Sequence, residues 1–400
     1  MALTQVRARL GDSWIDLAYN PATGRYEGEV TPERTSFHQP GGYFPITVAI
    51  QNEAGDAAEI SGDAMPSLRL VVRETAAPVL ALISPPPGFL ITQSPVFILQ
   101  AVDEEGGSGI DPDSFSLEGA QREAVAGGYR YTWTPPEPWA DGAHTLTVSV
   151  RDYDGNESTV SGTYIVDTIP PALYIKKPYM RHVTDDWSVT VAGTARDVNG
   201  VEVLVNGAPA GGEEFSALVP LEVGENHILV TARDGAGLET TEEVYMIRLI
   251  TDRTKADVDA LNTIYDRPMA SWTKEELAWF NTAVQRGAYN DADMNRVGIA
   301  VRFLAGELVR HGYAPNVQPK TDWAMEDAPT RSQGETYRKN VETIRDVQGL
   351  DSLKAWQLPR SLRQLNHEAA NAIEKALVET DAVFPRYTAW TAGEITCGGA

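Results

Sequence analysis

One strand-and-turn pattern occurs three times in the first 240 residues, and it constrains the fold more than any other feature. The copies span residues 43–55, 143–155 and 225–237. Each copy has alternating apolar residues, then Asn or Asp, then Gly three positions later. Alternation places every second side chain on one face of a strand. Asn, Asp and Gly tolerate the backbone angles of a tight turn, so the pattern predicts three β-rich units.

The spacing of these copies sets the expected domain lengths. Gly55, Gly155 and Gly237 are 100 and 82 residues apart, which is about one β-sandwich per copy. We therefore expect sandwiches over residues 1–76, 77–168 and 169–250. Residues 67–73 alternate and are predicted to form the last strand of the first sandwich.

The apolar period changes from two to three or four after Thr251, which predicts an all-α C-terminal region. Thr273 and Glu276 have the spacing of a capping box. Helices are expected over residues 291–310, 330–347 and 361–380, with Gly312 ending the first. We divide this region into a helical module, 251–348, and a helical extension with a short tail, 349–400. The residues predicted to pack the module are Met294, Val297, Val301, Leu304, Leu308 and Trp323.

The charge distribution excludes several classes of partner. The formal net charge is −23, and residues 1–250 hold 35 acidic but only 15 basic side chains. Binding to nucleic acid requires basic surface that neutralises phosphates, and docking on an anionic membrane requires the same. We therefore expect neither partner. No stretch approaches 18 apolar residues, so no membrane-spanning segment is predicted.

Cysteine content and the N-terminus bear on where the chain is expected to assemble. The single cysteine, Cys397, cannot form an internal disulfide. Residues 1–7 lack the apolar core and preceding positive charge of a secretory signal. Sandwiches made without such a signal are typical of a particle that is assembled in the cytoplasm and released by lysis.

Two resemblances sharpen this expectation. The linker Asp167-Thr-Ile-Pro-Pro171 and the repeated pattern resemble those of bacterial immunoglobulin-like domains. Residues 40–48 resemble a segment found in virion proteins of phages that infect Firmicutes. Residues 251–259, 287–297 and 320–330 resemble a helical module common in tail and baseplate proteins of such phages. The resemblance covers about 251–348, ends after residue 350, and implies a virion structural protein.

Acidic loops are the only candidates for a metal site in the sequence. Asp152, Asp154 and Asn156 offer alternating oxygens, and another loop holds Asp103, Glu104, Glu105, Asp111 and Asp113. Calcium needs about six to eight oxygens, usually from separate loops. The alternative is a turn with solvated carboxylates, and we predict no cofactor. No histidine pair has metal-ligand spacing, and no nucleophile or nucleotide motif is present, so no catalytic residue is assigned.

Aromatic residues are the candidates for surface contact. Tyr129, Tyr131 and Trp133 share one strand face, where core packing is the expected role. Trp139 lies outside the alternation and Tyr153 sits at the tip of an acidic turn, so these two are predicted to contact a partner.

These features together predict a non-enzymatic structural protein of a phage tail, fibre or baseplate, or of a phage-tail-like particle. The expected partners are other virion proteins, further copies of the chain in a homo-oligomer, and host cell-surface polysaccharide. Two alternatives stay open. One is a bacterial surface adhesin; the other is a carbohydrate-active enzyme with accessory sandwiches, although the helical region is too short for a barrel of about 250 residues.

Overall fold

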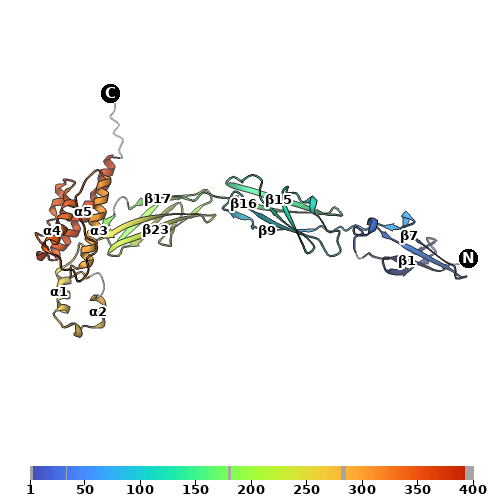
Figure 1. Cartoon of the computed structure of the whole chain (residues 1–400), viewed down its shortest axis with the longest axis horizontal. Coiled ribbons are helices and arrows are strands. Elements are labelled where there is room, and N and C mark those ends of the chain that lie inside the picture. The colour runs from blue at the N-terminus through green and yellow to red at the C-terminus, as the bar shows by residue number, and fades with distance from the viewer. Residues whose placement is uncertain (1–2, 33, 179–181, 281–284, 392–400) are drawn as a thin grey trace, which may run out of the picture. The chain divides into compact units, whose positions relative to one another are not determined.

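The computed structural model describes residues 3–32, 34–178, 182–280 and 285–391. Cys397 lies outside these residues. The chain forms two compact units, residues 1–169 (unit 1) and 170–400 (unit 2). Strands occupy the chain up to residue 248 and five helices follow within the described residues (Figure 1). The predicted fold class, tandem sandwich-like sheets followed by an all-α region, is confirmed. None of the described helices combines the length and apolar character needed to cross a membrane.

The first part of unit 1 is a four-stranded sheet in the order β2-β1-β6-β7, with two additional strand pairs, β3-β4 and β5-β8. Among its described residues only two apolar side chains, Val6 and Phe44, are buried. The predicted last strand, 67–73, shortens to two residues because Pro66 begins a 3-10 turn. The strands are β1 Leu3–Leu10, β2 Ser13–Asp16, β3 Ala18–Asn20, β4 Arg25–Glu27, β5 Phe44–Pro45, β6 Thr47–Asn52, β7 Ala57–Ser61 and β8 Arg69–Leu70.

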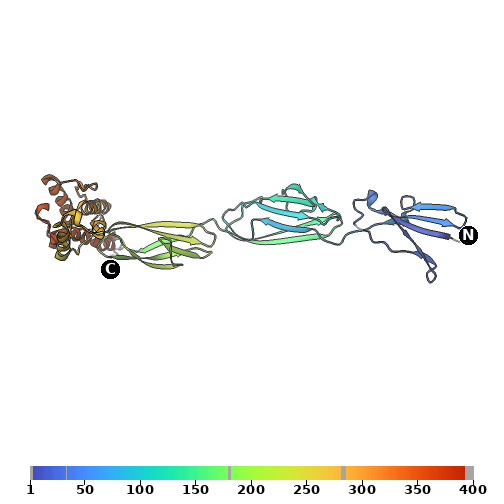
Figure 2. The ribbon, with the colours of Figure 1, turned by 90° about the horizontal axis from the view of Figure 1, so that it is seen from below.

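The second part of unit 1 is a sandwich of two four-stranded sheets, β10-β16-β15-β12 and β13-β14-β11-β9. Alternate residues of β11 and β15 face the core, which holds Phe97, Leu99 and Tyr131 at 1% exposure or less. Figure 2 gives the second view of these sheets. The strands are β9 Val79–Ser84, β10 Gly88–Leu90, β11 Phe97–Val102, β12 Ile110–Asp111, β13 Gln121–Val125, β14 Gly128–Trp133, β15 Gly142–Asp152 and β16 Glu157–Val166.

Unit 2 begins with a third set of strands that form one eight-stranded sheet in the order β17-β19-β22-β21-β20-β23-β24-β18. Asn206-Gly207 is a sequence pair that predicts a hairpin turn. Both residues have a positive φ and make the turn between β20 and β21. The strands are β17 Ala172–Lys177, β18 Val183–Thr184, β19 Ser188–Arg196, β20 Val201–Val205, β21 Ala208–Gly211, β22 Glu214–Pro220, β23 Gly224–Asp234 and β24 Glu239–Arg248.

The repeated sequence pattern forms the same turn three times. In each copy the Gly N–H donates to the carbonyl of the residue three positions earlier, at 3.1–3.2 Å for Asn52, Asp152 and Asp234. Each Gly has a positive φ of 85–97°, which favours glycine because it has no Cβ. The side chain of each Asn or Asp accepts a further backbone N–H four residues on. Each turn joins a long antiparallel pair, β6-β7, β15-β16 or β23-β24.

The helices of unit 2 pack at one end of its sheet (Figures 1 and 2). Asn290 and Asp293 form a reciprocal capping box at the start of α3, and Gly312, at φ 86°, follows its end. Thr273 and Glu276 form the predicted box before α2. The helices are α1 Lys255–Tyr265, α2 Lys274–Phe280, α3 Asp291–Arg310, α4 Arg331–Asp346 and α5 His367–Thr391.

One hydrophobic core crosses the predicted boundary at residue 250. Val183 of β18, Ile247 of β24 and Leu249 pack with buried residues of α3, α4 and α5. Two carboxylates of α5 reinforce this junction. Glu374 accepts the N–H of Ile250 at 2.7 Å, and Asp381 accepts those of His182 and Val183 at 2.8 and 2.9 Å. The sheet and the helices of unit 2 are therefore one folded body.

We expect Asn290→Ala to lower the free energy of unfolding of unit 2 by about 1 kcal/mol, because the α3 cap then loses its side-chain acceptor. The ellipticity at 222 nm during urea unfolding measures this, since the described helices all lie in unit 2. Asn290→Asp keeps an acceptor and is the matched control. Equal stabilities of the Ala and Asp variants would contradict the capping role.

Candidate functional site

The most unusual chemistry of the described residues lies in unit 1, where the linker between β8 and β9 meets loops of the second sandwich. The Glu74 N–H donates to Asp154 Oδ2 at 3.0 Å, and Thr35 Oγ1 donates to the same oxygen at 2.6 Å. Asn156 Nδ2 donates to the carbonyl of Glu74 at 3.2 Å. These bonds fix the linker against the repeated turn of the second sandwich.

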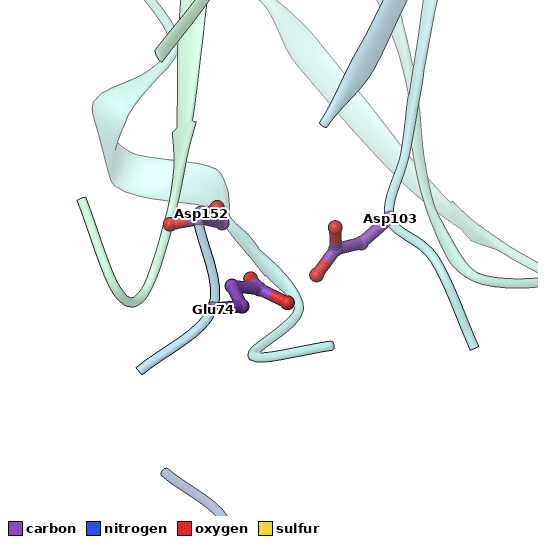
Figure 3. Close-up of side chains that lie close together, drawn as sticks. All are labelled: Glu74, Asp103 and Asp152. Atoms are coloured by element: carbon purple, nitrogen blue, oxygen red, sulfur yellow. The ribbon is translucent and has the colours of Figure 1, made fainter. Parts of the chain in front are cut away.

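Three carboxylates converge at this junction (Figure 3). Glu74 comes from the linker, Asp103 follows β11, and Asp152 ends β15. One oxygen of each lies within 4.8 Å of an oxygen of the other two. Asp152 is only 2% exposed, and Glu74 and Asp103 are partly buried. The cluster therefore concentrates negative charge where water has limited access.

Backbone and hydroxyl donors hold one side of each carboxylate. Glu74 Oε1 accepts from the N–H and the Oγ of Ser108 at 3.0 and 2.6 Å. Asp103 Oδ2 accepts from the Gly109 N–H at 2.6 Å, and both Asp152 oxygens accept from Asn156. The other oxygens, Glu74 Oε2 and Asp103 Oδ1, are buried and have no hydrogen-bond partner. Two lone-pair-bearing oxygens of the cluster are thus buried without a donor.

The electrostatics of the cluster follow from this geometry. Burial raises the pKa of Glu74. The Ser108 hydrogen bonds oppose that rise, and the charge of Asp103 adds to it. In the described part of the chain, no Lys or Arg forms an ion pair with any of the three carboxylates, although ion pairs are frequent elsewhere. The arrangement can hold a cation through oxygen ligands.

The other acidic residues considered in the sequence have different roles. Asp154 accepts the junction hydrogen bonds. Asp111 caps a 3-10 helix, and Asp113 pairs with Arg122 at 2.7 Å. Glu104 and Glu105 are exposed. Asp103 and Asp152 were among the acidic residues that the sequence offered as candidates for a metal site. Glu74 was missed, because it lies in the linker and belongs to no motif. The only indication of its role was its place beside a predicted domain boundary.

The two predicted contact residues differ in exposure. Tyr153 is 45% exposed and stacks on Phe37, with ring centroids 4.7 Å apart. Trp139 is partly buried: it packs against the core of the second sandwich, 5.4 Å from Phe97, and stacks on His144. Of the strand aromatics, Tyr131 is buried, and Tyr129 and Trp133 pack against the same core.

The predicted packing residues of the helical module all lie in the core of unit 2. Trp323 is 6% exposed, and its backbone N–H and carbonyl both bond to Asn295 of α3. The others are Met294, Val297, Val301, Leu304 and Leu308, each 7% exposed or less.

A buried ion network that the sequence did not indicate lies beside this core. Glu374, fully buried, accepts from Arg253 at 2.6 Å and from Arg296 at 2.9 Å. Asp293 accepts from the same two guanidinium groups. Burial alone would raise the pKa of Glu374, but Arg296 and Arg253 outweigh it and hold the pKa below its ordinary value. The four groups pair with one another, although the buried Arg253 Nε has no hydrogen-bond partner. This mutual pairing indicates a structural role.

Comparison with known families identifies two of the β-rich parts. Residues 92–168 match the model of a bacterial Ig-like domain, and residues 171–248 match the model of glucodextranase, domain B. The Ig-like assignment therefore rests on the second sandwich. No curated protein matches the chain.

Solved structures with some similarity are multidomain β proteins. The fibronectin(III)-like modules of Clostridium thermocellum CbhA are 17% identical, with 42% of this chain and 94% of that chain covered, at a TM-score of 0.29. A segment of titin is 13% identical over 60% and 87%, at 0.29. Extracellular domains 3–5 of Drosophila OTK are 13% identical over 62% and 85%, at 0.25.

Proposed function

We propose that this chain is a non-enzymatic structural component of a phage tail or of a phage-tail-like particle. The β-rich parts present binding surfaces, and the helices dock onto another particle protein or onto further copies of the chain. The Ig-like assignment supports a surface or adhesion type of module. The resemblance of residues 251–348 to a helical tail and baseplate module supports the place in a particle.

The observation that carries this proposal is the common core of unit 2. Ile247 and Leu249 pack directly among the helices, and Arg253, Glu374 and Asp293 tie the chain just after β24 to α3 and α5. Helices that share one hydrophobic core with a sheet are suited to anchoring β-rich modules on a particle. A catalytic domain carried with accessory modules would instead need a cleft with its own acid, base or nucleophile.

Immunoelectron microscopy of particles released from cells that produce the chain tests this proposal. Antibodies against the purified full chain are expected to label particle tails. Label confined to the cell envelope would replace the proposal with the adhesin alternative. Release of soluble sugar from cell-wall polysaccharide by the full chain would replace it with the enzyme alternative.

A specific observation also favours binding of host glycans. Residues 171–248 match a model named for a glucodextranase domain, and this stretch carries two strongly exposed aromatic side chains, Tyr174 (63%) and Trp187 (62%). The buried Arg248 guanidinium lies 3.5 Å from the centroid of the Trp187 ring, which holds the indole in one orientation. Rigid exposed aromatics contribute large contact area at low entropy cost.

We expect Trp187→Ala to weaken glycan binding by roughly tenfold, which corresponds to about 1.4 kcal/mol. Binding of the full chain, displayed in multiple copies on beads, to host cell-wall polysaccharide measures this. Leu218→Ala is the matched control, because Leu218 is 71% exposed on β22 of the same sheet. Absence of binding by the multivalent native chain would remove the glycan role and leave an architectural one.

A further inference from the structure

The acid cluster of unit 1, formed by Glu74, Asp103 and Asp152, carries negative charge that its own residues do not compensate. Three carboxylates share one space, yet two of their buried oxygens have no donor. Within the described residues no ion pair compensates them. Buried carboxylate oxygens are normally satisfied by hydrogen bonds, by cationic side chains or by a bound metal. The first two are missing for Glu74 Oε2 and Asp103 Oδ1.

An independent observation comes from the eight-stranded sheet of unit 2. Asp197 follows β19 as Asp103 follows β11, and Asp234 ends β23 as Asp152 ends β15. Oxygens of Asp197 and Asp234 lie within 4.8 Å of each other. Asp234 is only 6% exposed, and its Oδ2 is buried without a partner. The chain thus places the same pair of acids at the same strand ends twice, each time with an unsatisfied buried oxygen.

The donor set decides which cation fits. The cluster offers carboxylate oxygens and no nitrogen or sulfur ligand, which disfavours zinc and copper. Magnesium usually keeps several waters and binds through one or two carboxylates, whereas calcium accepts several carboxylates in irregular geometry. Three carboxylates from three segments match calcium.

We propose that Glu74, Asp103 and Asp152 bind a calcium ion that ties the linker of the first sheet to the second sandwich. Ser108, Gly109 and Asn156 orient the carboxylates through the hydrogen bonds described above. The ion neutralises the cluster and joins Glu74, from the linker, to two groups of the sandwich. This inference does not depend on the particle in which the chain acts.

Calorimetric titration of the calcium-depleted full chain with CaCl₂ tests the assignment. Extracellular modules bind calcium with dissociation constants of about 10⁻⁴–10⁻³ M, and we expect this range or tighter. Asp103→Asn and Glu74→Gln keep the side-chain size and are each expected to weaken this binding at least about tenfold. Circular dichroism confirms that each variant is folded.

Two controls make the result specific. Glu104→Gln removes the same charge from the same loop, but Glu104 is exposed, so its binding should match that of the native chain. Asp234→Asn removes an acid of the unit 2 pair and should leave the Asp103-dependent binding in place. Equal loss in Glu104→Gln and Asp103→Asn, or equal affinity for MgCl₂ and CaCl₂, would overturn the proposal. So would the absence of calcium binding in the native chain.

Trypsin provides a second readout at the junction itself. Arg73 is exposed and directly precedes Glu74. Calcium should slow cleavage after Arg73 in the native chain and in Glu104→Gln, because it restrains the linker, but not in Asp103→Asn. Equal cleavage rates of the native chain with and without calcium would contradict the proposal that the ion ties the linker to the sandwich.

Discussion

Glu374→Ala is expected to lower the free energy of unfolding of unit 2 by about 3–5 kcal/mol. The substitution leaves Arg253 and Arg296, 4% and 5% exposed, without one of their two carboxylate partners. Breaking a buried ion network by removing one partner carries a penalty of this size, because the remaining charge stays out of water. It also removes the acceptor of the Ile250 N–H at the end of the sheet.

Thermal unfolding followed at 222 nm measures this loss. For a unit of this size about 1 kcal/mol corresponds to roughly 2–4 °C, so the midpoint should fall by about 6–20 °C. Glu368→Ala is the control, since Glu368 is exposed on the first turn of the same helix. A midpoint for Glu374→Ala within the scatter of this control would show that the network contributes little to stability.

Phe97→Ala is expected to destabilise the second sandwich by about 3–5 kcal/mol. Phe97 is fully buried on β11 and lies 5.1–5.9 Å, between ring centroids, from Trp133, Trp139 and Tyr164. Truncation removes the ring from the middle of this aromatic group and leaves a cavity that rigid indoles fill poorly.

Urea unfolding followed by near-ultraviolet circular dichroism detects the change, because the environments of Trp133 and Trp139 dominate the aromatic signal of this sandwich. The matched control is Phe89→Ala, because Phe89 is 40% exposed on β10 of the same sandwich. Equal effects of the two substitutions would mean that the aromatic group does not organise the core.

The sequence predicted those features that depend on local pattern. The bounds of α3 equal the predicted 291–310, because a capping box, an apolar stripe and Gly312 all act within one helix. The capping box of α2 and the hairpin at Asn206 were predicted for the same reason. The three turns follow from Asn or Asp and Gly at fixed spacing.

Features that depend on contacts between distant segments were not predictable. Glu74 meets Asp103 and Asp152 across 29 and 78 residues, and no periodicity links them. Ile247 and Leu249 are buried among the helices. The sheet and the helices therefore share a core, although the change in apolar period near residue 250 assigned them to different domains. Trp139 breaks the strand alternation and yet packs against the core, with its ring centroid 5.4 Å from that of Phe97.

The common core of unit 2 has a consequence for synthesis on the ribosome. Ile247 and Leu249 of the sheet pack with Ile373 and Leu377 of α5, and the backbone of His182 and Val183 bonds to Asp381. These partners are translated about 130 residues after Ile247, which at about 5–20 residues per second takes roughly 7–26 s. During that interval the nascent sheet exposes apolar surface and unpaired N–H groups. The end of the sheet is therefore completed only after α5 has been synthesised.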